Sequence, residues 1–245
     1  TIGLQGGGFS ADEKRILFSS NKTGVWNTYS IPVGGGDWTP ITTSTTDNNY
    51  SVAFFPKDDR VLVTADQGGN ELNHLYVIGT DGKRTDLTPG DKLKAQFGGF
   101  SKDHTQFFVA TNERDPKFFD LYRYDAKTYA RRTVYENTEG YQVGALSGDQ
   151  RWIALRKPNT SNDSDLFVRD LSTGKTTKIS EHKGVASFDD ADFSPDSQWL
   201  YYTTNDGGEF TELRRVSVST WKHEVVRKAD WDVTDACFSE RGKYL

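Results

Sequence analysis

The sequence predicts an all-β fold made of repeated four-stranded antiparallel units, and three observations predict it. A marker dipeptide, one large apolar residue followed by Ser or Pro, recurs at intervals of 46, 45, 46, 47 and 45 residues. Each marker is followed by a polar turn and then by further strand-like segments. No segment has sustained helical periodicity with end caps. The markers are Phe9-Ser10, Phe55-Pro56, Phe100-Ser101, Leu146-Ser147, Phe193-Ser194 and Phe238-Ser239.

Four strands within a repeat of about 40 to 50 residues are typical of a β-propeller, in which similar sheets repeat around an axis. We therefore predict five complete blades and the start of a sixth, forming one domain over residues 1–245. A β-sandwich also has many short strands, but it gives no reason for nearly equal intervals. The expected blades are 4–42, 50–88, 95–135, 142–180, 188–227 and an incomplete 233–245.

The first strand of each blade carries the marker, and we expect it to line the central channel. A short turn follows, rich in the Asp, Gly, Pro and Ser residues that favour tight turns. These turns are Ala11-Asp12-Glu13-Lys14, Lys57-Asp58-Asp59, Lys102-Asp103-His104, Gly148-Asp149-Gln150, Pro195-Asp196-Ser197 and Glu240-Arg241-Gly242.

The second strand is apolar on successive residues, as expected for a strand covered on both faces. It is predicted at 15–20, 60–65, 105–111, 151–156 and 198–204.

In the third strand apolar and polar residues alternate more clearly. The fourth strand is short, and we expect it at the rim. Turn pairs that supply positive φ separate them in several blades, for example Asp81-Gly82 and Thr173-Gly174. The third strand is predicted at 27–33, 72–79, 118–125, 165–171 and 213–219, and the fourth at 39–42, 84–88, 131–135, 176–180 and 223–227.

Composition restricts the function classes. The chain of 245 residues has a net charge of −5 and spreads its 30 basic residues along its length, so we expect no nucleic-acid partner. No apolar run approaches the roughly 20 residues of a membrane span. Cys237 is the only cysteine, so no disulfide framework is expected. Nothing in the sequence implies a cofactor.

The ends of the sequence carry a further expectation. The chain opens on Thr1, and it closes at Leu245 where the sixth unit has only begun its second strand. Because a propeller cannot close on a blade of one and a half strands, we expect the natural polypeptide to continue past Leu245.

Several segments resemble a known group of repeats. Residues 9–42 and the string Phe193-Ser194-Pro195-Asp196 are similar to the propeller repeat of the TolB family and of the N-terminal domains of prolyl oligopeptidase-family serine peptidases. Residues 68–76 and 112–125 resemble blade segments of the dipeptidyl and acylaminoacyl peptidase branches. The resemblance covers essentially the whole chain.

The resemblance implies an accessory domain without catalytic residues. In that peptidase family the propeller covers a C-terminal α/β-hydrolase domain of the same polypeptide and restricts the substrate to short peptides. This sequence lacks the Gly-x-Ser-x-Gly motif of such a nucleophile; the nearest string, Gly144-Ala145-Leu146-Ser147-Gly148, has its Ser one place late, and we interpret Ser147 as a turn residue. Bacterial cytoplasm and periplasm both stay open as locations.

Two other functions stay open. The first is a TolB-like adaptor of the bacterial envelope, which binds proteins and has no enzymatic activity. The second is a propeller lyase acting on oligosaccharides, which would need a His-rich metal cluster; the four histidines, His74, His104, His182 and His223, lie in different units without metal-ligand spacing.

Glu71, with its neighbour Asn70, is the candidate for substrate binding. In dipeptidyl peptidases of the family, acidic propeller residues hold the free amino terminus of the peptide, and the resemblance of residues 68–76 implies this role for Glu71. The alternative is that Glu71 anchors the loop between two strands.

Two acidic clusters have competing interpretations. Residues 159–165 offer oxygen ligands at calcium-like spacing, but they lack the Gly and distal Glu of an EF-hand loop, so we favour a solvated turn. Asp189, Asp190 and Asp192 could be a catalytic pair of carboxylates. Strand alternation would place Asp190 and Asp192 on one face and Phe193 on the other, and we favour channel lining or turn anchoring.

Overall fold

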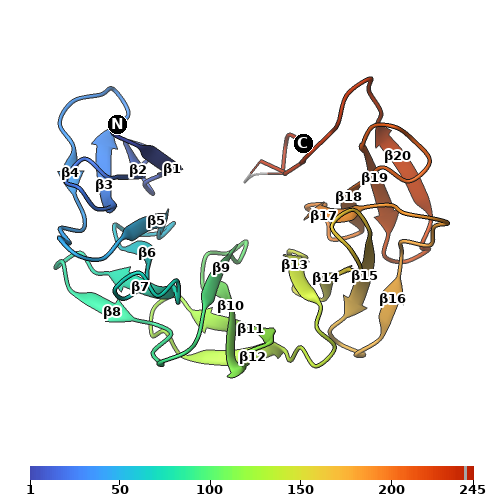
Figure 1. Ribbon diagram of the computed structural model, residues 1–245, viewed down its shortest axis with the longest axis horizontal. Helices are drawn as coiled ribbons and strands as arrows, with labels where there is room; N and C mark the ends of the chain where they lie inside the picture. The colour runs from blue at the N-terminus through green and yellow to red at the C-terminus, as the bar shows by residue number, and fades with distance from the viewer. Residues whose placement is uncertain (240–241) are drawn as a thin grey trace. The chain divides into compact units, whose positions relative to one another are not determined.

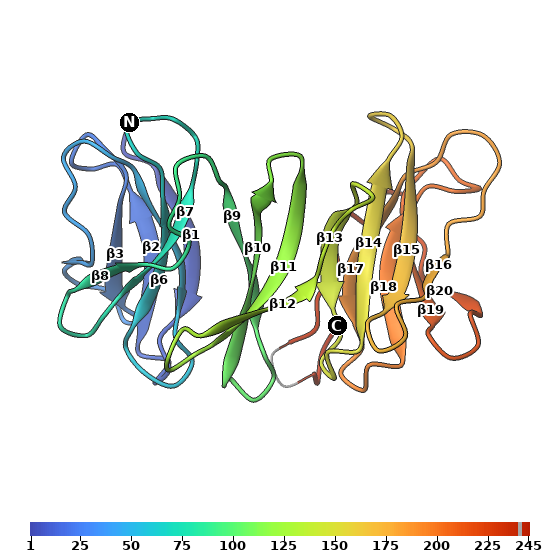
Figure 2. The same ribbon diagram turned by 90° about the horizontal axis from the view of Figure 1, so that it is seen from below.

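The computed structural model of the chain describes residues 1–239 and 242–245. It contains five four-stranded antiparallel sheets, in agreement with the predicted fold (Figure 1). Strands that follow one another in the chain are neighbours in each sheet, so every strand connection within a sheet is a hairpin (Figure 2). The contacts divide the chain into two compact units, Thr1–Thr133 and Val134–Leu245.

The first unit holds three sheets, which we number 1 to 3. Sheet 1 consists of β1 (Leu4–Phe9), β2 (Arg15–Ser20), β3 (Asn27–Pro32) and β4 (Thr39–Pro40). Sheet 2 consists of β5 (Asn49–Phe54), β6 (Val61–Ala65), β7 (His74–Ile78) and β8 (Arg84–Asp86). Sheet 3 consists of β9 (Ala95–Phe100), β10 (Gln106–Asp115), β11 (Phe118–Asp125) and β12 (Arg131–Tyr135), whose end crosses into the second unit.

The second unit holds sheets 4 and 5. Sheet 4 consists of β13 (Gln142–Leu146), β14 (Trp152–Pro158), β15 (Ser164–Asp170) and β16 (Thr176–Lys178). Sheet 5 consists of β17 (Phe188–Phe193), β18 (Trp199–Thr204), β19 (Glu212–Ser217) and β20 (His223–Arg227).

Within each unit the sheets pack through the apolar second and third strands. Leu17 of sheet 1 packs with Val63 and Tyr76 of sheet 2. On the other face of sheet 2, Leu62 and Val77 join Phe107 of sheet 3. In the second unit Leu166 of sheet 4 packs with Leu200 and Tyr202 of sheet 5. The residues predicted for the second and third strands together therefore supply most of the core, and the second strands are buried on both faces.

The serine of the marker dipeptide recurs because its hydroxyl group holds the turn that follows the first strand. The hydroxyl groups of Ser10, Ser101, Ser147 and Ser194 each donate to the Asp two residues later, at 2.5 to 2.7 Å. The same oxygens accept the backbone N–H five residues later, at 2.9 to 3.0 Å. The fourth residue of each turn has a left-handed φ of 57 to 60°; these residues are Glu13, His104, Gln150 and Ser197. The Ser-x-Asp pattern therefore closes the hairpin between the first and second strands.

The first strand of every sheet contains a bulge, which the sequence analysis did not predict. The pairing shifts between Ser51 and Ala53 in β5 and between Asp190 and Asp192 in β17, for example. A bulge places two residues opposite one, so it breaks the alternation of faces along the strand. The prediction that simple alternation sets the faces of Asp190 and Asp192 was therefore wrong.

The described residues after β20 form no strand, although a marker strand was expected from residue 233. A strand needs a neighbour to pair with, and instead the Phe238 N–H donates to Asp192 Oδ2 at 3.1 Å. Ser239 Oγ nevertheless accepts the Tyr244 N–H at 3.0 Å, the same serine contact as in the other marker turns. Glu240 and Arg241 of the expected turn lie outside the described residues.

Candidate functional site

The candidate residues Asn70 and Glu71 lie in the loop between β6 and β7 of sheet 2, residues 66–73. Because the strands are antiparallel hairpins, this loop emerges at the same end of sheet 2 as the chain entering β5 from sheet 1. The Gly68 N–H donates to Asp47 Oδ1 at 2.7 Å, which ties the loop to that entering segment. The loop is thus held at one end of the first unit.

The loop is closed by its own polar groups. Asp66 Oδ2 accepts the Glu71 N–H at 3.0 Å, and Asn70 Oδ1 accepts the Leu72 N–H at 2.9 Å. Gly68 and Gly69 have φ values of 64° and 75°, a conformation that glycine adopts at little cost. Glu71 has a φ of 59°, which is strained for a residue with a side chain.

These contacts separate the roles of the two candidate residues. Asn70 uses its carbonyl oxygen to hold the loop, so it has a structural part there. Glu71 contributes only its backbone N–H to the loop, while its side chain is exposed. Within residues 1–239 and 242–245, no cationic side chain lies at ion-pair distance from the Glu71 carboxylate. Glu71 therefore anchors the loop through its backbone N–H, and the role of its carboxylate stays a prediction.

The anchoring carboxylates are Asp47 and Asp66, which the sequence analysis missed. The available signal was an Asp placed just before the Gly68-Gly69 turn, because Asp commonly accepts backbone N–H groups in turns. Burial raises the pKa of Tyr50, and the negative charge of Asp66 adds to that effect. This end of sheet 2 therefore holds three acidic side chains. Asp47 and Asp66 accept backbone N–H groups, whereas the carboxylate of Glu71 is exposed. Such a place can bind an ammonium group through charge-assisted hydrogen bonds.

The three aspartates of β17 are structural. Asp189 Oδ1 forms an ion pair with Arg156 Nε at 2.6 Å, and Asp190 Oδ2 accepts the Ala145 N–H at 2.7 Å. Asp192 accepts the Phe238 N–H. Each carboxylate thus joins β17 to a different neighbouring segment, which supports anchoring over acid-base chemistry. Burial raises the pKa of Asp190, while the hydrogen bond from Ala145 opposes that shift.

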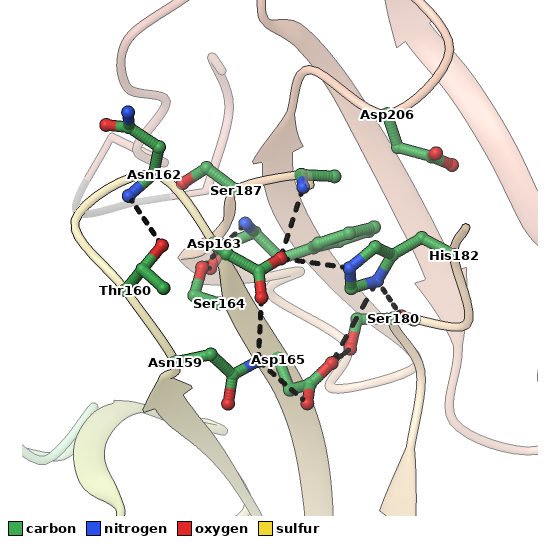
Figure 3. A network of polar contacts seen from close by, with 12 residues as sticks. Asn159, Thr160, Asn162, Asp163, Ser164, Asp165, Ser180, His182, Ser187 and Asp206 are labelled. Carbon is green, nitrogen blue, oxygen red and sulfur yellow. Dashed lines mark hydrogen bonds and ion pairs between the residues drawn. The ribbon is translucent and has the colours of Figure 1, made fainter. Parts of the chain in front are cut away.

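The calcium-like segment 159–165 belongs to a closed polar network around His182 (Figure 3). The imidazole of His182 has Ser180 O at 2.7 Å from Nδ1 and Asp163 Oδ1 at 3.1 Å from Nε2. Lys178 Nζ lies 2.8 Å from Asp165 Oδ1, and Asn159 Nδ2 donates to Asp163 and Asp165. The carboxylates are thus occupied by protein donors, as in an ordinary turn. Among the described residues, no group of three or more His, Cys, Asp or Glu side chains could hold a metal ion.

The remaining predicted residues have structural positions. Ser147 closes a marker turn through Asp149 and the Trp152 N–H, as interpreted from the sequence. His74 is buried with Nδ1 2.9 Å from Asp86 Oδ2, and His223 Nδ1 lies 2.7 Å from the hydroxyl of Tyr202. In the part of the chain that the structure describes, no helix is long and apolar enough to cross a membrane.

Comparison with solved structures identifies the fold. The chain is similar to a prolyl endopeptidase with a TM-score of 0.69 and 16% identity, over 90% of this chain and 34% of that one. It is similar to TolB from Acinetobacter baumannii with a TM-score of 0.55 and 20% identity, over 90% of this chain and 53% of that one. It is similar to an oligogalacturonate lyase from Vibrio parahaemolyticus with a TM-score of 0.66 and 15% identity, over 96% of this chain and 67% of that one.

No protein-family model matches the sequence, and no curated protein is similar to it. The chain spans about half the length of the Acinetobacter TolB and about a third of the prolyl endopeptidase. At these identities the likeness shows the fold alone. The chain therefore has the propeller-like architecture that peptidase, TolB and lyase structures share, built from five four-stranded antiparallel sheets.

Proposed function

We propose that this chain is a non-catalytic, substrate-gating propeller of a serine peptidase that hydrolyses short peptides. The catalytic α/β-hydrolase domain would be a further part of the same polypeptide, beyond the C-terminal end of this chain. The observation that carries the proposal is the Glu71 carboxylate, which is exposed on an anchored loop and has no cationic partner in the described chain. The likeness to a prolyl endopeptidase structure gives supporting context.

The physical role of Glu71 would be to hold the free amino terminus of a peptide. Because Asp47 and Asp66 fix the loop, its backbone loses little conformational freedom on binding. An ammonium–carboxylate contact would also set the distance from the amino terminus to the cleaved bond, which would favour short peptides of defined length. N-acetylation removes this positive charge and would remove the contact.

The test is a comparison of kcat/KM for a free-amine peptide and its N-acetylated form, using the complete polypeptide encoded with this chain. Glu71→Gln keeps the size of the side chain and removes the charge. Glu71→Gly removes the side chain and suits the left-handed φ, so loss of activity through strain is avoided. Glu209→Gln, an exposed glutamate in the corresponding loop between β18 and β19, is the matched control.

We expect both Glu71 variants to lower kcat/KM for the free-amine peptide by about tenfold, the size of a charged hydrogen bond, with little change for the acetylated peptide. Glu209→Gln should change neither. Equal kinetics in wild type and both Glu71 variants would remove Glu71 from substrate binding. A complete polypeptide without peptidase activity would remove the peptidase assignment as a whole.

A TolB-like adaptor is the second candidate, and the likeness of the chain to TolB structures supports it. The chain covers 79% of a putative TolB from Agrobacterium tumefaciens, at 16% identity and a TM-score of 0.56. An adaptor would bind a protein of the bacterial envelope and hydrolyse nothing. Labelling of the complete polypeptide with a fluorophosphonate, which reacts with activated serines, separates the two, because only the peptidase contains such a serine.

A further inference from the structure

Two aromatic rings of sheet 1, one on β3 and one on the loop between β3 and β4, face the ammonium group of an exposed lysine. Lys22 Nζ lies 4.3 Å from the centre of the Trp38 ring and 4.6 Å from the centre of the Tyr29 ring. Phe18 meets Trp38 edge to face, with ring centres 4.8 Å apart. We call Phe18, Tyr29 and Trp38 the aromatic cage. A cation within about 6 Å of two ring faces is attracted by both, because each face is the negative end of a quadrupole.

The rings of the cage are held in place before any ligand arrives. Phe18 and Tyr29 are neighbours across β2 and β3, and both are buried. Trp38 is carried by the loop between β3 and β4, where Gly35 and Gly36 have φ values of 85° and 124°. These glycines allow the sharp turn that brings Trp38 back over the strand pair. The Trp38 ring therefore has a fixed orientation, and it remains partly exposed.

Space and charge beside the cage suit a cationic ligand. An open pocket of about 350 Å³ is lined by Lys22, Gly36, Asp37 and Trp38. Asp37 is exposed, and its carboxylate has no ion-pair partner among residues 1–239 and 242–245. Lys22 is itself exposed and sits on a flexible stem, so another cation can displace its ammonium group at small cost.

We propose that the aromatic cage with Asp37 is a binding site for alkylammonium groups, and that Lys22 occupies it in the free protein. A methylated ammonium is favoured over an ordinary one, because it loses less hydration when it moves onto the rings. The group can be a small free ion or the methylated end of a lysine side chain. This site is separate from Glu71 and does not depend on the proposed peptidase function.

The alternative is that Lys22 only covers apolar ring surface with its stem. In that case its removal would expose the rings without creating affinity for cations. Lys157 provides a matched control, since its ammonium group lies 5.7 Å from one ring, that of Tyr141. Lys157→Ala uncovers a single ring and should create no site.

The test is titration of the chain with tetramethylammonium, followed by calorimetry and by the NMR signal of the Trp38 indole. Trimethyllysine in a short peptide is titrated in parallel, and 3,3-dimethylbutanol serves as the neutral analogue. We expect Lys22→Ala to bind tetramethylammonium about tenfold more tightly than wild type, the gain from vacating two ring faces. Trp38→Leu and Asp37→Asn in the Lys22→Ala background should each weaken binding, with circular dichroism to verify folding.

If the trimethyllysine peptide binds more tightly than tetramethylammonium, the ligand is a methylated side chain. If tetramethylammonium binds more tightly, the ligand is a small free ion. Either result supports the proposed site. Equal binding of 3,3-dimethylbutanol would overturn the proposal, because charge would then play no part. So would a Lys22→Ala protein that binds tetramethylammonium no better than Lys157→Ala does.

Discussion

The carboxylate of Asp190 lies in the space beside Gly144 that a side chain at residue 144 would occupy. It uses this space to accept the backbone N–H of Ala145 at 2.7 Å. Asp190 belongs to sheet 5 and Gly144 to sheet 4, so the glycine allows the first strands of the two sheets to be joined by a partly buried hydrogen bond. The bulge in β17 accompanies this contact, since the pairing shifts directly after Asp190.

Replacing Gly144 tests this relationship. In Gly144→Ala the new methyl group overlaps both oxygens of Asp190, so the hydrogen bond to Ala145 is strained or lost. We expect the free energy of unfolding in urea to fall by about 1 to 3 kcal/mol. Gly148→Ala is the control: its methyl group meets only Ser197 Oγ at an ordinary 3.7 Å, and it should be nearly neutral. Equal losses in the two variants would contradict the close approach of Asp190.

The charge of Asp190 gives a second prediction. Burial raises the folded pKa of Asp190 above the unfolded value of about 3.9, so the group favours folding below pH ~4 and this contribution is lost as pH rises through the folded pKa. Asp190→Asn keeps an oxygen for the Ala145 N–H without the charge. At pH 7 the variant should be as stable as wild type or more stable, by up to about 1 kcal/mol.

The pH dependence of stability shows which protonation state of Asp190 favours folding. Urea unfolding of wild type and Asp190→Asn at several pH values should show the advantage of the variant shrinking as pH falls through the folded pKa toward ~4, with no further change below ~4. A variant that is less stable at pH 7 and gains stability relative to wild type on acidification would show that the charged form is the favoured one.

The marker serines give a third prediction. The hydroxyl of Ser194 donates to Asp196 and accepts the Trp199 N–H at 3.0 Å, so Ser194→Ala loses both hydrogen bonds of this buried serine. We expect a loss of about 1 to 2 kcal/mol in the free energy of unfolding. Ser161→Ala, at an exposed position in the loop before β15, should be within about 0.5 kcal/mol of wild type. Identical stabilities would mean that the marker reflects something other than this turn.

The protonation of His182 gives a fourth prediction, which concerns pH values near and above 6.5. Both ring nitrogens face oxygen acceptors, Ser180 O and Asp163 Oδ1, so the doubly protonated ring satisfies both. The hydrogen bond to the Ser180 carbonyl raises the pKa of His182, with the Asp163 carboxylate acting in the same direction. NMR titration should therefore give a pKa above ~6.5.

Because the folded pKa is raised, the contribution of His182 to stability is fully present below ~6.5 and is lost as pH rises through the folded value. The stability difference between wild type and His182→Gln should be larger at pH 5.5 than at pH 8.5. A difference that grows toward alkaline pH would indicate that the neutral ring is the folded form.

The sequence predicted the sheets well because their signals are local. The turn of Ser194 and Asp196 and the apolar run that follows lie within a dozen residues of one another, and β18 begins within one residue of its predicted start. The bulges were not predicted, because a bulge depends on the neighbouring sheet: Asp190 is turned toward Ala145, which lies 45 residues earlier.

The candidate site was predicted only in part, for a similar reason. A family resemblance picked out Glu71, but the sequence alone did not indicate that Asp66 and Asp47 would hold the loop and leave the Glu71 carboxylate uncommitted. The contact of Lys22 with Trp38 was also missed, since it joins two loops on either side of β3. Contacts between loops depend on how the folded sheet places the loops, so they leave no regular pattern in the sequence.

The most direct test of the proposed function is an NMR titration of this chain with a short free-amine peptide and its N-acetylated form, observing the backbone amides. If Glu71 holds the amino terminus, we expect shifts of the amides of residues 66–72 with the free-amine peptide, weaker shifts with the acetylated one, and loss of the free-amine shifts in Glu71→Gln. Shifts of equal size with both peptides, or shifts at 66–72 that persist in Glu71→Gln, would contradict it.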